Sequence, residues 1–266
     1  MSCMDLPLPD TAYSIEFDEE GPDGHAFGRP PGLHPGQWPR SRAVGLPMPH
    51  LFTVRVPEQY RCAGPDLAGL SVFQAGDDRA DPVDGVADTI AGGEPPSDTA
   101  FWSALTEYAR SRHPEERYQT DDIAGGWAWI WLTEAELAGP PCPLPDPATR
   151  LEGTEDTTDA WRADRPPRRL RLVARVDDPN VGKTYVEFDK TSGYIDMFSE
   201  EGKRLGLVER FFYQQHFGGT IVPPNGGEDI GPFFLAFDEK LGDPNLGGDG
   251  MAQLDLATEY LQWSCG

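Results

Sequence analysis

The chain has 266 residues, enough for one large domain or two small ones, and 38% hydrophobic residues to build a core. Its 30 glycines and 27 prolines disfavour long helices and favour short strands joined by turns. A net charge of −23 excludes free nucleic acid and anionic membranes as partners, because a surface that binds phosphate needs clustered Lys and Arg.

The first half of the chain is expected to contain two strands and one helix. Residues 1–49 are rich in proline and glycine, which predicts an irregular lead-in. The β-branched and aromatic residues that follow predict strands over 50–56 and 69–75. The Gly, Pro and Asp residues of 76–98 predict a long acidic loop there. Apolar residues at helical spacing predict a helix over 99–112.

The second half is expected to be richer in strands. A strand is expected over 126–132, and a loop with seven prolines over 138–168. The remaining pattern predicts strands over 170–177, 184–189, 194–198, 233–238 and 251–256, and a closing helix over 257–263. This order predicts an α+β fold with a mixed or antiparallel sheet, few helices and long Pro/Gly-rich loops.

Three tryptophans alternate with aliphatic residues in the strand expected over 126–132. They are Trp127, Trp129 and Trp131. Successive side chains on a strand point to opposite faces, so the three indoles share one face. The other face is also apolar, which favours a strand buried on both sides. The alternative is a binding surface on which the indoles stack sugars or bases.

No catalytic or cofactor motif in the chain is complete. Gly182-Lys183-Thr184 lacks the earlier glycine of a phosphate-binding loop, because Asp177 stands there, and an expected strand follows where that motif needs a helix. The five histidines include no i,i+4 pair on a helix, and none of the four cysteines lies in a C-x-x-C pair. We therefore expect no catalytic residue, no cofactor and no metal, and cysteines that are reduced or bridged only between the two termini.

Two charged clusters have two interpretations each. The stretch over 238–255 contains Asp and Asn residues among glycines, which suit either calcium or ordinary turns. Six arginines between residues 162 and 175 could hold a phosphate-bearing ligand or pair with the chain's own acids. They are Arg162, Arg165, Arg168, Arg169, Arg171 and Arg175.

Short motifs in both halves of the chain resemble the YwqG-like family of uncharacterised bacterial proteins. The motifs are Gln37-Trp38-Pro39, Gly45 to Phe52, Asp66 to Gln74, His216-Phe217-Gly218-Gly219, Pro232 to Asp238 and Gly248 to Asp255. The resemblance covers roughly residues 30–75 and 213–256. The two halves also resemble each other, since each has an apolar strand, a polar loop and a second strand that opens with glycine, and an internal duplication would explain this.

The resemblance implies one compact α+β domain over residues 1–266, a bacterial cytosolic setting and no established enzymatic activity. Relatives in the family include candidate immunity proteins of toxin systems. The chain shows no basic leader followed by an apolar segment, and no run near ~18 apolar residues. We therefore expect a cytoplasmic protein without a membrane helix.

These observations predict a non-catalytic module that binds a basic protein, in its leading version an immunity-type protein that neutralises a bacterial toxin. The acids expected to face the partner are Asp77, Asp78, Asp81, Asp84, Asp88, Glu152, Glu155, Asp156 and Asp159. One alternative is an enzyme that uses His216 with Asp229 or Asp249. Another is a structural or assembly subunit, and the charge could also serve solubility alone.

Overall fold

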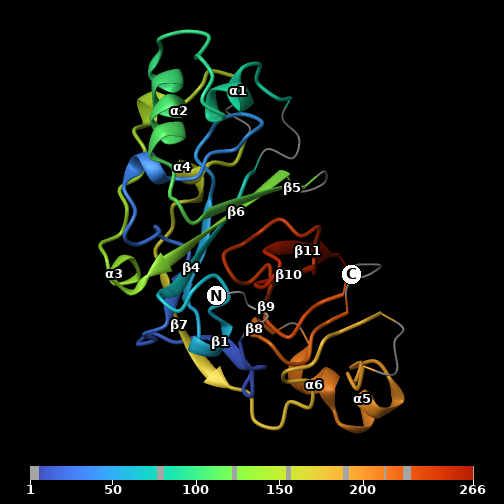
Figure 1. The fold of residues 1–266 in the computed structure, drawn as a ribbon. Helices are drawn as coiled ribbons and strands as arrows, with labels where there is room; N and C mark the ends of the chain where they lie inside the picture. The colour runs from blue at the N-terminus through green and yellow to red at the C-terminus, as the bar shows by residue number, and fades with distance from the viewer. Residues whose placement is uncertain are drawn as a thin grey trace. The chain divides into compact units, whose positions relative to one another are not determined.

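The computed structural model describes residues 6–76, 81–121, 125–153, 157–187, 192–212, 214–223 and 229–265 (Figure 1). In these ranges the sheet is mostly antiparallel, and the longest helix has 12 residues. The expected fold class, a sheet protein with few helices and long loops, is confirmed.

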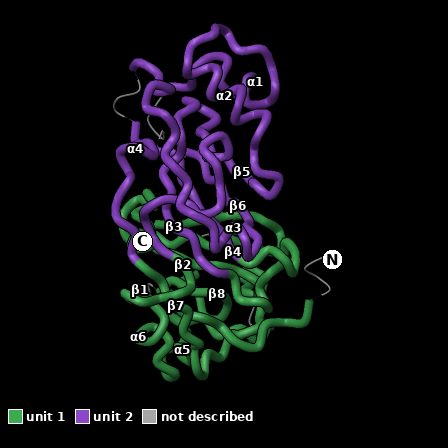
Figure 2. Tube along the Cα trace, turned by 90° about the vertical axis from the view of Figure 1, so that its left-hand side faces the viewer, with its two compact units in different colours: residues 1–24, 56–68, 169–266 green, residues 25–55, 69–168 purple. Residues whose placement is uncertain are grey.

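Two compact units divide the chain (Figure 2). Unit 1 consists of Met1–Gly24, Val56–Ala68 and Arg169–Gly266, and unit 2 consists of His25–Arg55 and Gly69–Arg168. Each unit is therefore assembled from segments that lie far apart in sequence. The single domain expected over 1–266 stays a prediction.

Unit 1 contains an antiparallel sheet in the order β11, β10, β9, β8, β1, β7. Its strands are β1 (Tyr13–Phe17), β7 (Arg168–Ala174, whose first residue belongs to unit 2), β8 (His216–Phe217), β9 (Phe234–Asp238), β10 (Met251–Asp255) and β11 (Tyr260–Ser264). Its helices are η3 (Glu58–Tyr60), α5 (Glu200–Arg204) and α6 (Leu207–Phe211). Every residue of β9 and β10 is buried, as expected for strands covered on both faces.

Unit 2 contains a sheet in the order β2, β3, β4, β6, β5. Its strands are β2 (Gly24–Ala26), β3 (His50–Arg55), β4 (Leu67–Gln74), β5 (Glu116–Asp121) and β6 (Gly125–Thr133), of which β2 and β4 begin in unit 1. Its helices are η2 (Pro35–Gln37), α1 (Val86–Ile90), α2 (Ala100–Ser111), α3 (Glu134–Leu137), η4 (Pro147–Thr149) and α4 (Ala160–Ala163). Trp127, Trp129 and Trp131 are at most 1% exposed, so their interpretation as core residues is confirmed.

The two units repeat one arrangement of strands. In unit 2 the short strand β2 precedes the antiparallel pair β3–β4, and in unit 1 β8 precedes the pair β9–β10. Residues with positive φ follow both short strands: Phe27 and Gly28 after β2, and Gly218 and Gly219 after β8. The first of each pair donates its N–H to the next strand, at the oxygen of Leu51 (2.7 Å) and of Phe234 (3.0 Å). This correspondence supports the internal duplication.

Three expected elements at the C-terminal side differ from the structure. Residues 257–263 are not a helix, because the Asp255 carboxylate accepts the N–H groups of Ala257 and Thr258 and turns the chain into β11. Residues 194–198 are not a strand, because they lead into α5, whose first turn is capped by the Ser199 hydroxyl. In the segment 184–189, Tyr185 forms an isolated bridge with Ile230, and residues 188–189 lie outside the described residues.

Two expected irregular segments contain regular structure. The lead-in over 1–49 includes β1 and β2, and the loop over 76–98 includes α1. The strand β5 follows the predicted helix and was not expected. In the described residues of the loop expected over 138–168, the regular structure before β7 consists of η4 and α4.

Candidate functional site

The helices α1 and α2 of unit 2 form a small lobe with its own apolar cluster (Figure 1). The cluster consists of Val86, Ile90, Phe101, Trp102, Leu105 and Tyr108. Two flanking loops also pack against it, through Val83 and Leu151. We call residues 81–112 the acidic lobe. Its apolar side is buried in this cluster, so its polar side faces outward.

The acidic lobe carries a local excess of negative charge. Residues 81–112 include six carboxylates and two cationic residues, Arg110 and Arg112, both of which lie at the end of α2. Asp81, Asp84, Asp88, Glu94 and Asp98 are exposed, and none forms an ion pair with a described residue. Since unpaired carboxylates repel one another, a basic partner would relieve this repulsion.

Four of the nine expected partner-facing acids are exposed. Asp81, Asp84 and Asp88 lie in the acidic lobe. Glu152 follows Leu151, which packs against the same apolar cluster, so the fold brings this acid to the lobe. The positions of Asp77, Asp78, Glu155 and Asp156 lie outside the described residues.

Asp159 corrects the expected set of acids, because it is only 1% exposed. Its Oδ1 accepts the N–H of Arg162 (3.0 Å) and caps α4, and its Oδ2 pairs with Arg150 (2.8 Å). A buried capping carboxylate does not present its charge to a partner. Glu94 and Asp98 are exposed in the acidic lobe but are not among the nine expected acids. Their position in the same Gly/Pro-rich acidic stretch could have indicated them.

His216 lies buried in unit 1, without contact to the carboxylates proposed for it. Its Nδ1 donates to the carbonyl of Gly218 (2.7 Å), and its ring packs edge-on against Phe234. Burial and, secondarily, the charge of Arg175 hold the pKa of His216 well below its usual range. Neither Asp229 nor Asp249 contacts it among the described residues, so the structure does not bring this catalytic pair together.

The glycines after His216 allow close packing. A Cβ at Gly218 would lie 2.0 Å from the hydroxyl of Tyr60, and a Cβ at Gly219 would lie 2.4 Å from Asp178 Oδ2. Both glycines also have positive φ angles, which other residues rarely adopt. The His-x-Gly-Gly element therefore serves the packing of unit 1.

Two members of the arginine cluster pair with acids of unit 1. Arg171 pairs with Asp18 (2.8 Å), and Arg175 pairs with Asp178 (3.3 Å) in the interior. The Asp178 carboxylate also accepts the hydroxyl of Thr220 (2.8 Å), and burial lowers the pKa of Arg175 to about 10. This pairing agrees with the structural interpretation of the cluster for these two residues.

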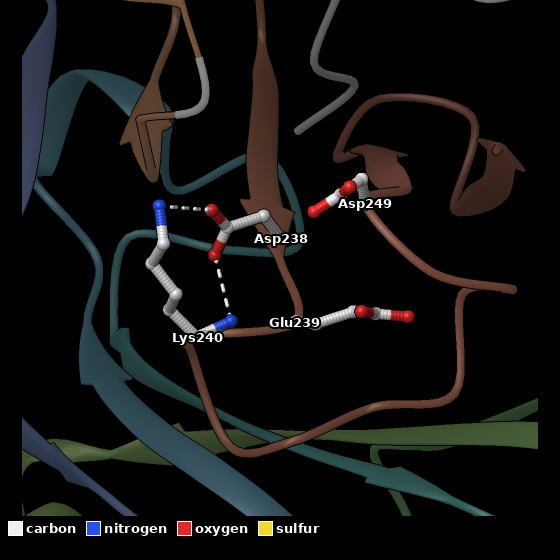
Figure 3. Close-up of a pocket in the computed structure, with 4 residues that line it drawn as sticks. All are labelled: Asp238, Glu239, Lys240 and Asp249. Carbon is white, nitrogen blue, oxygen red and sulfur yellow. Dashed lines mark hydrogen bonds and ion pairs between the residues drawn. The ribbon is translucent and has the colours of Figure 1, made fainter. Parts of the chain in front are cut away.

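A pocket of about 210 Å³ in unit 1 is lined by Asp238, Glu239, Lys240 and Asp249 (Figure 3). Asp238 Oδ1 accepts the backbone N–H of Lys240 (2.8 Å), and its Oδ2 pairs with Lys240 Nζ (3.4 Å). Glu239 Oε1 accepts two backbone N–H groups of the 246–248 turn, each at 3.0 Å. In the described part of the chain no group of three or more His, Cys, Asp and Glu residues could hold a metal ion. These contacts favour the turn interpretation of 238–255.

The cysteines differ in state. Cys142 is buried as a free thiol, and this burial raises its pKa to about 12, which disfavours the nucleophilic thiolate. Cys265 is exposed and forms no disulfide, which excludes the bridge between the two terminal cysteines. Cys62 is disulfide-bonded, so the expectation of a reduced thiol is wrong there.

Comparisons with protein-family models, with curated proteins and with solved structures found no match for this chain. The resemblance to the YwqG-like family therefore stays a prediction. In the ranges that the structure describes, every helix is too short or too polar to cross a membrane.

Proposed function

We propose that this chain is a non-catalytic protein-binding module that binds a basic protein partner through the acidic lobe. The observation that carries the proposal is the set of five exposed carboxylates over 81–98 without ion-pair partners among the described residues. A surface of one sign raises the rate at which a partner of the opposite sign arrives. Binding of this kind needs a complementary surface and no reactive group.

The version that we favour is an immunity-type protein that acts in the cytoplasm and neutralises a bacterial toxin. Its support is the resemblance of residues 30–75 and 213–256 to the YwqG-like family, together with the acidic lobe. A toxin that acts on nucleic acid needs a basic cleft for phosphates, and an acidic lobe complements such a cleft. Occupying the cleft would block access of the substrate.

A growth-rescue assay tests this function. The product of the neighbouring gene is expressed in a bacterial host together with this chain, and growth is measured. We expect the wild-type chain to restore growth. The lobe variant, in which the five exposed acids of 81–98 become Asn or Gln, should restore it less.

A matched variant separates the site from the total charge. It neutralises five exposed acids of unit 1 instead, namely Glu19, Glu20, Glu58, Asp66 and Glu209. Both variants remove five negative charges, and the unit 1 variant should rescue growth as the wild type does. Equal loss of rescue in both would show that only total charge matters, and a non-toxic neighbour would remove the immunity version.

A further inference from the structure

One buried hydrogen bond joins the acidic lobe to the sheet of unit 2. Tyr108 belongs to the apolar cluster of the lobe, and Glu116 is the first residue of β5. The Tyr108 hydroxyl donates to Glu116 Oε1, and the two residues are 2% and 8% exposed. The lobe and the sheet therefore share a contact that includes a titratable group.

The second carboxylate oxygen of Glu116 is left without a partner. Oε2 is buried and accepts no hydrogen bond from any residue that the structure describes. An ionised carboxylate in such a place lacks the two or more donors that it would have in water. A protonated carboxyl avoids most of this cost, because it carries no charge.

Several charged groups surround this carboxyl. Arg112, at the end of α2, and Arg42, in the segment before β3, both favour its ionised form. The buried Arg40 interacts electrostatically with both Tyr108 and Glu107. His113 and Glu115 precede it, with the His113 ring bonded to Glu136 (3.1 Å) and Glu115 paired with Arg117 (3.4 Å).

Burial outweighs these favourable charges. It is the largest influence on Glu116 and raises the pKa to about 7, although the bond from Tyr108, Arg112 and Arg42 all lower it. A carboxyl that titrates near 7 changes its charge in the range in which most proteins work.

We propose that Tyr108 and Glu116 form a proton-operated latch that holds the acidic lobe on the sheet while Glu116 is protonated and loosens it when Glu116 ionises. The ionised Oε2 gains hydration only if water enters between α2 and β5. The lobe keeps other contacts to the rest of unit 2, such as the hydrogen bond from the Ser111 hydroxyl to Gly36 O (2.8 Å). Ionisation therefore raises the frequency of opening and does not unfold the unit.

Proton linkage determines whether opening of the lobe increases or decreases with pH. The closed form binds the Glu116 proton more tightly than an open form with the ordinary pKa of 4.5. Opening is therefore least frequent below pH 4.5, rises between pH 4.5 and about 7, and changes little above that range. The consequence for partner binding, a more mobile lobe at higher pH, rests on the proposed function, whereas the latch itself does not.

Hydrogen exchange of the free full-length chain tests the latch. Protection of peptides from α2 is compared with that of peptides from β4 at pH 5.5 and 8.5, after correction for the intrinsic exchange rate. From the two pKa values, the opening equilibrium of α2 should rise by about 30-fold between these pH values. Peptides from β4 should change much less.

Two variants decide the cause of such a change. Glu116→Gln keeps the acceptor for Tyr108 and removes the charge, so its α2 protection should stay constant with pH. Glu107→Gln, an exposed acid on the same helix, should behave as the wild type does. Equal loss of protection in wild type and Glu116→Gln, or no loss in the wild type, would overturn the proposal.

A measurement on the wild type covers the case in which Glu116→Gln fails to fold. The side-chain carboxyl carbon of Glu116 is followed by NMR between pH 4 and 9. A midpoint near 7 supports the latch, and a midpoint below 5 overturns it. Both experiments use the chain without a partner, so their failure would not bear on the proposed function.

Discussion

The hydroxyl of Tyr60 occupies the space that a Cβ would need at position 218, at a distance of 2.0 Å. The same hydroxyl donates to the carbonyl of Thr11 (2.9 Å), so Tyr60 is fixed on both sides. Gly218 also has a φ of +60°. Gly218 thus leaves room for the Tyr60 hydroxyl and also adopts a positive φ that other residues rarely adopt.

Gly218→Ala should therefore destabilise the protein by roughly 3 kcal/mol or more, since overlap with a fixed side chain adds to the cost of positive φ. Gly248→Ala is the matched control, because Gly248 has a φ of +86° and nothing within 4 Å of its would-be Cβ. It should cost only about 1–2 kcal/mol. Urea unfolding measures both, and equal costs would show that Tyr60 moves aside.

The tryptophan row predicts a large loss of stability when one ring is removed. Trp129→Ala should cost about 3–5 kcal/mol, because Trp129 is 1% exposed and its removal leaves a cavity. Trp161→Ala is the comparison, since Trp161 is only partly buried and lies beneath Arg150. Denaturant unfolding of both should show the larger loss for Trp129. A loss below about 1 kcal/mol at Trp129 would contradict the core assignment.

His50 should stay neutral well below neutral pH. Burial, its largest influence, lowers the pKa of His50 to about 3. Its Nδ1 lies 3.2 Å from Gly28 O, a pure acceptor, so Nδ1 carries the proton and Nε2 accepts from the Thr53 hydroxyl (2.9 Å). Nitrogen NMR of the imidazoles at pH 5 should show this neutral tautomer. A protonated His50 at pH 5 would contradict it.

The same shift predicts how stability depends on pH. Because the folded-state pKa is lowered from 6.5 to about 3, the unfolded state binds more protons between these values. Stability from His50 is thus fully present above pH 6.5 and is lost as pH falls toward 3, by up to roughly 5 kcal/mol. His50→Gln should be less stable at pH 7 and show a shallower acid limb in urea unfolding. If the stability of wild type and His50→Gln fell equally steeply with decreasing pH, the lowered pKa of His50 would be contradicted.

Much of the fold could be predicted because the strands that form its core carry unbroken apolar runs. The strand around Trp129 and the helix around Leu105 follow from periodicity alone. β5 could not be predicted, because its sequence, Glu116 to Asp121, is polar and its stability comes from pairing with β6. The closing helix was predicted wrongly, because the turn set by Asp255 outweighs the local helical pattern.

The candidate site was predictable only in part. Exposed acids such as Asp84 and Asp88 lie in a stretch whose composition indicates a surface loop. Asp159 has the same composition around it, and only the fold shows that it caps α4 and pairs with Arg150. The burial of Glu116 could not be predicted either, since it depends on a helix that precedes it in the chain.

The central claim is that the acidic lobe attracts a basic partner, and the salt dependence of the association rate tests it most directly. Stopped-flow binding to the protein identified by growth rescue is measured from 0.01 to 0.15 M salt, over which the Debye length falls from about 30 to about 8 Å. The association rate of the wild type should fall steeply, while dissociation changes much less. The lobe variant should associate more slowly with a flatter salt slope, and the unit 1 variant should resemble the wild type. An association rate independent of salt, or equal slopes for the two variants, would contradict the account.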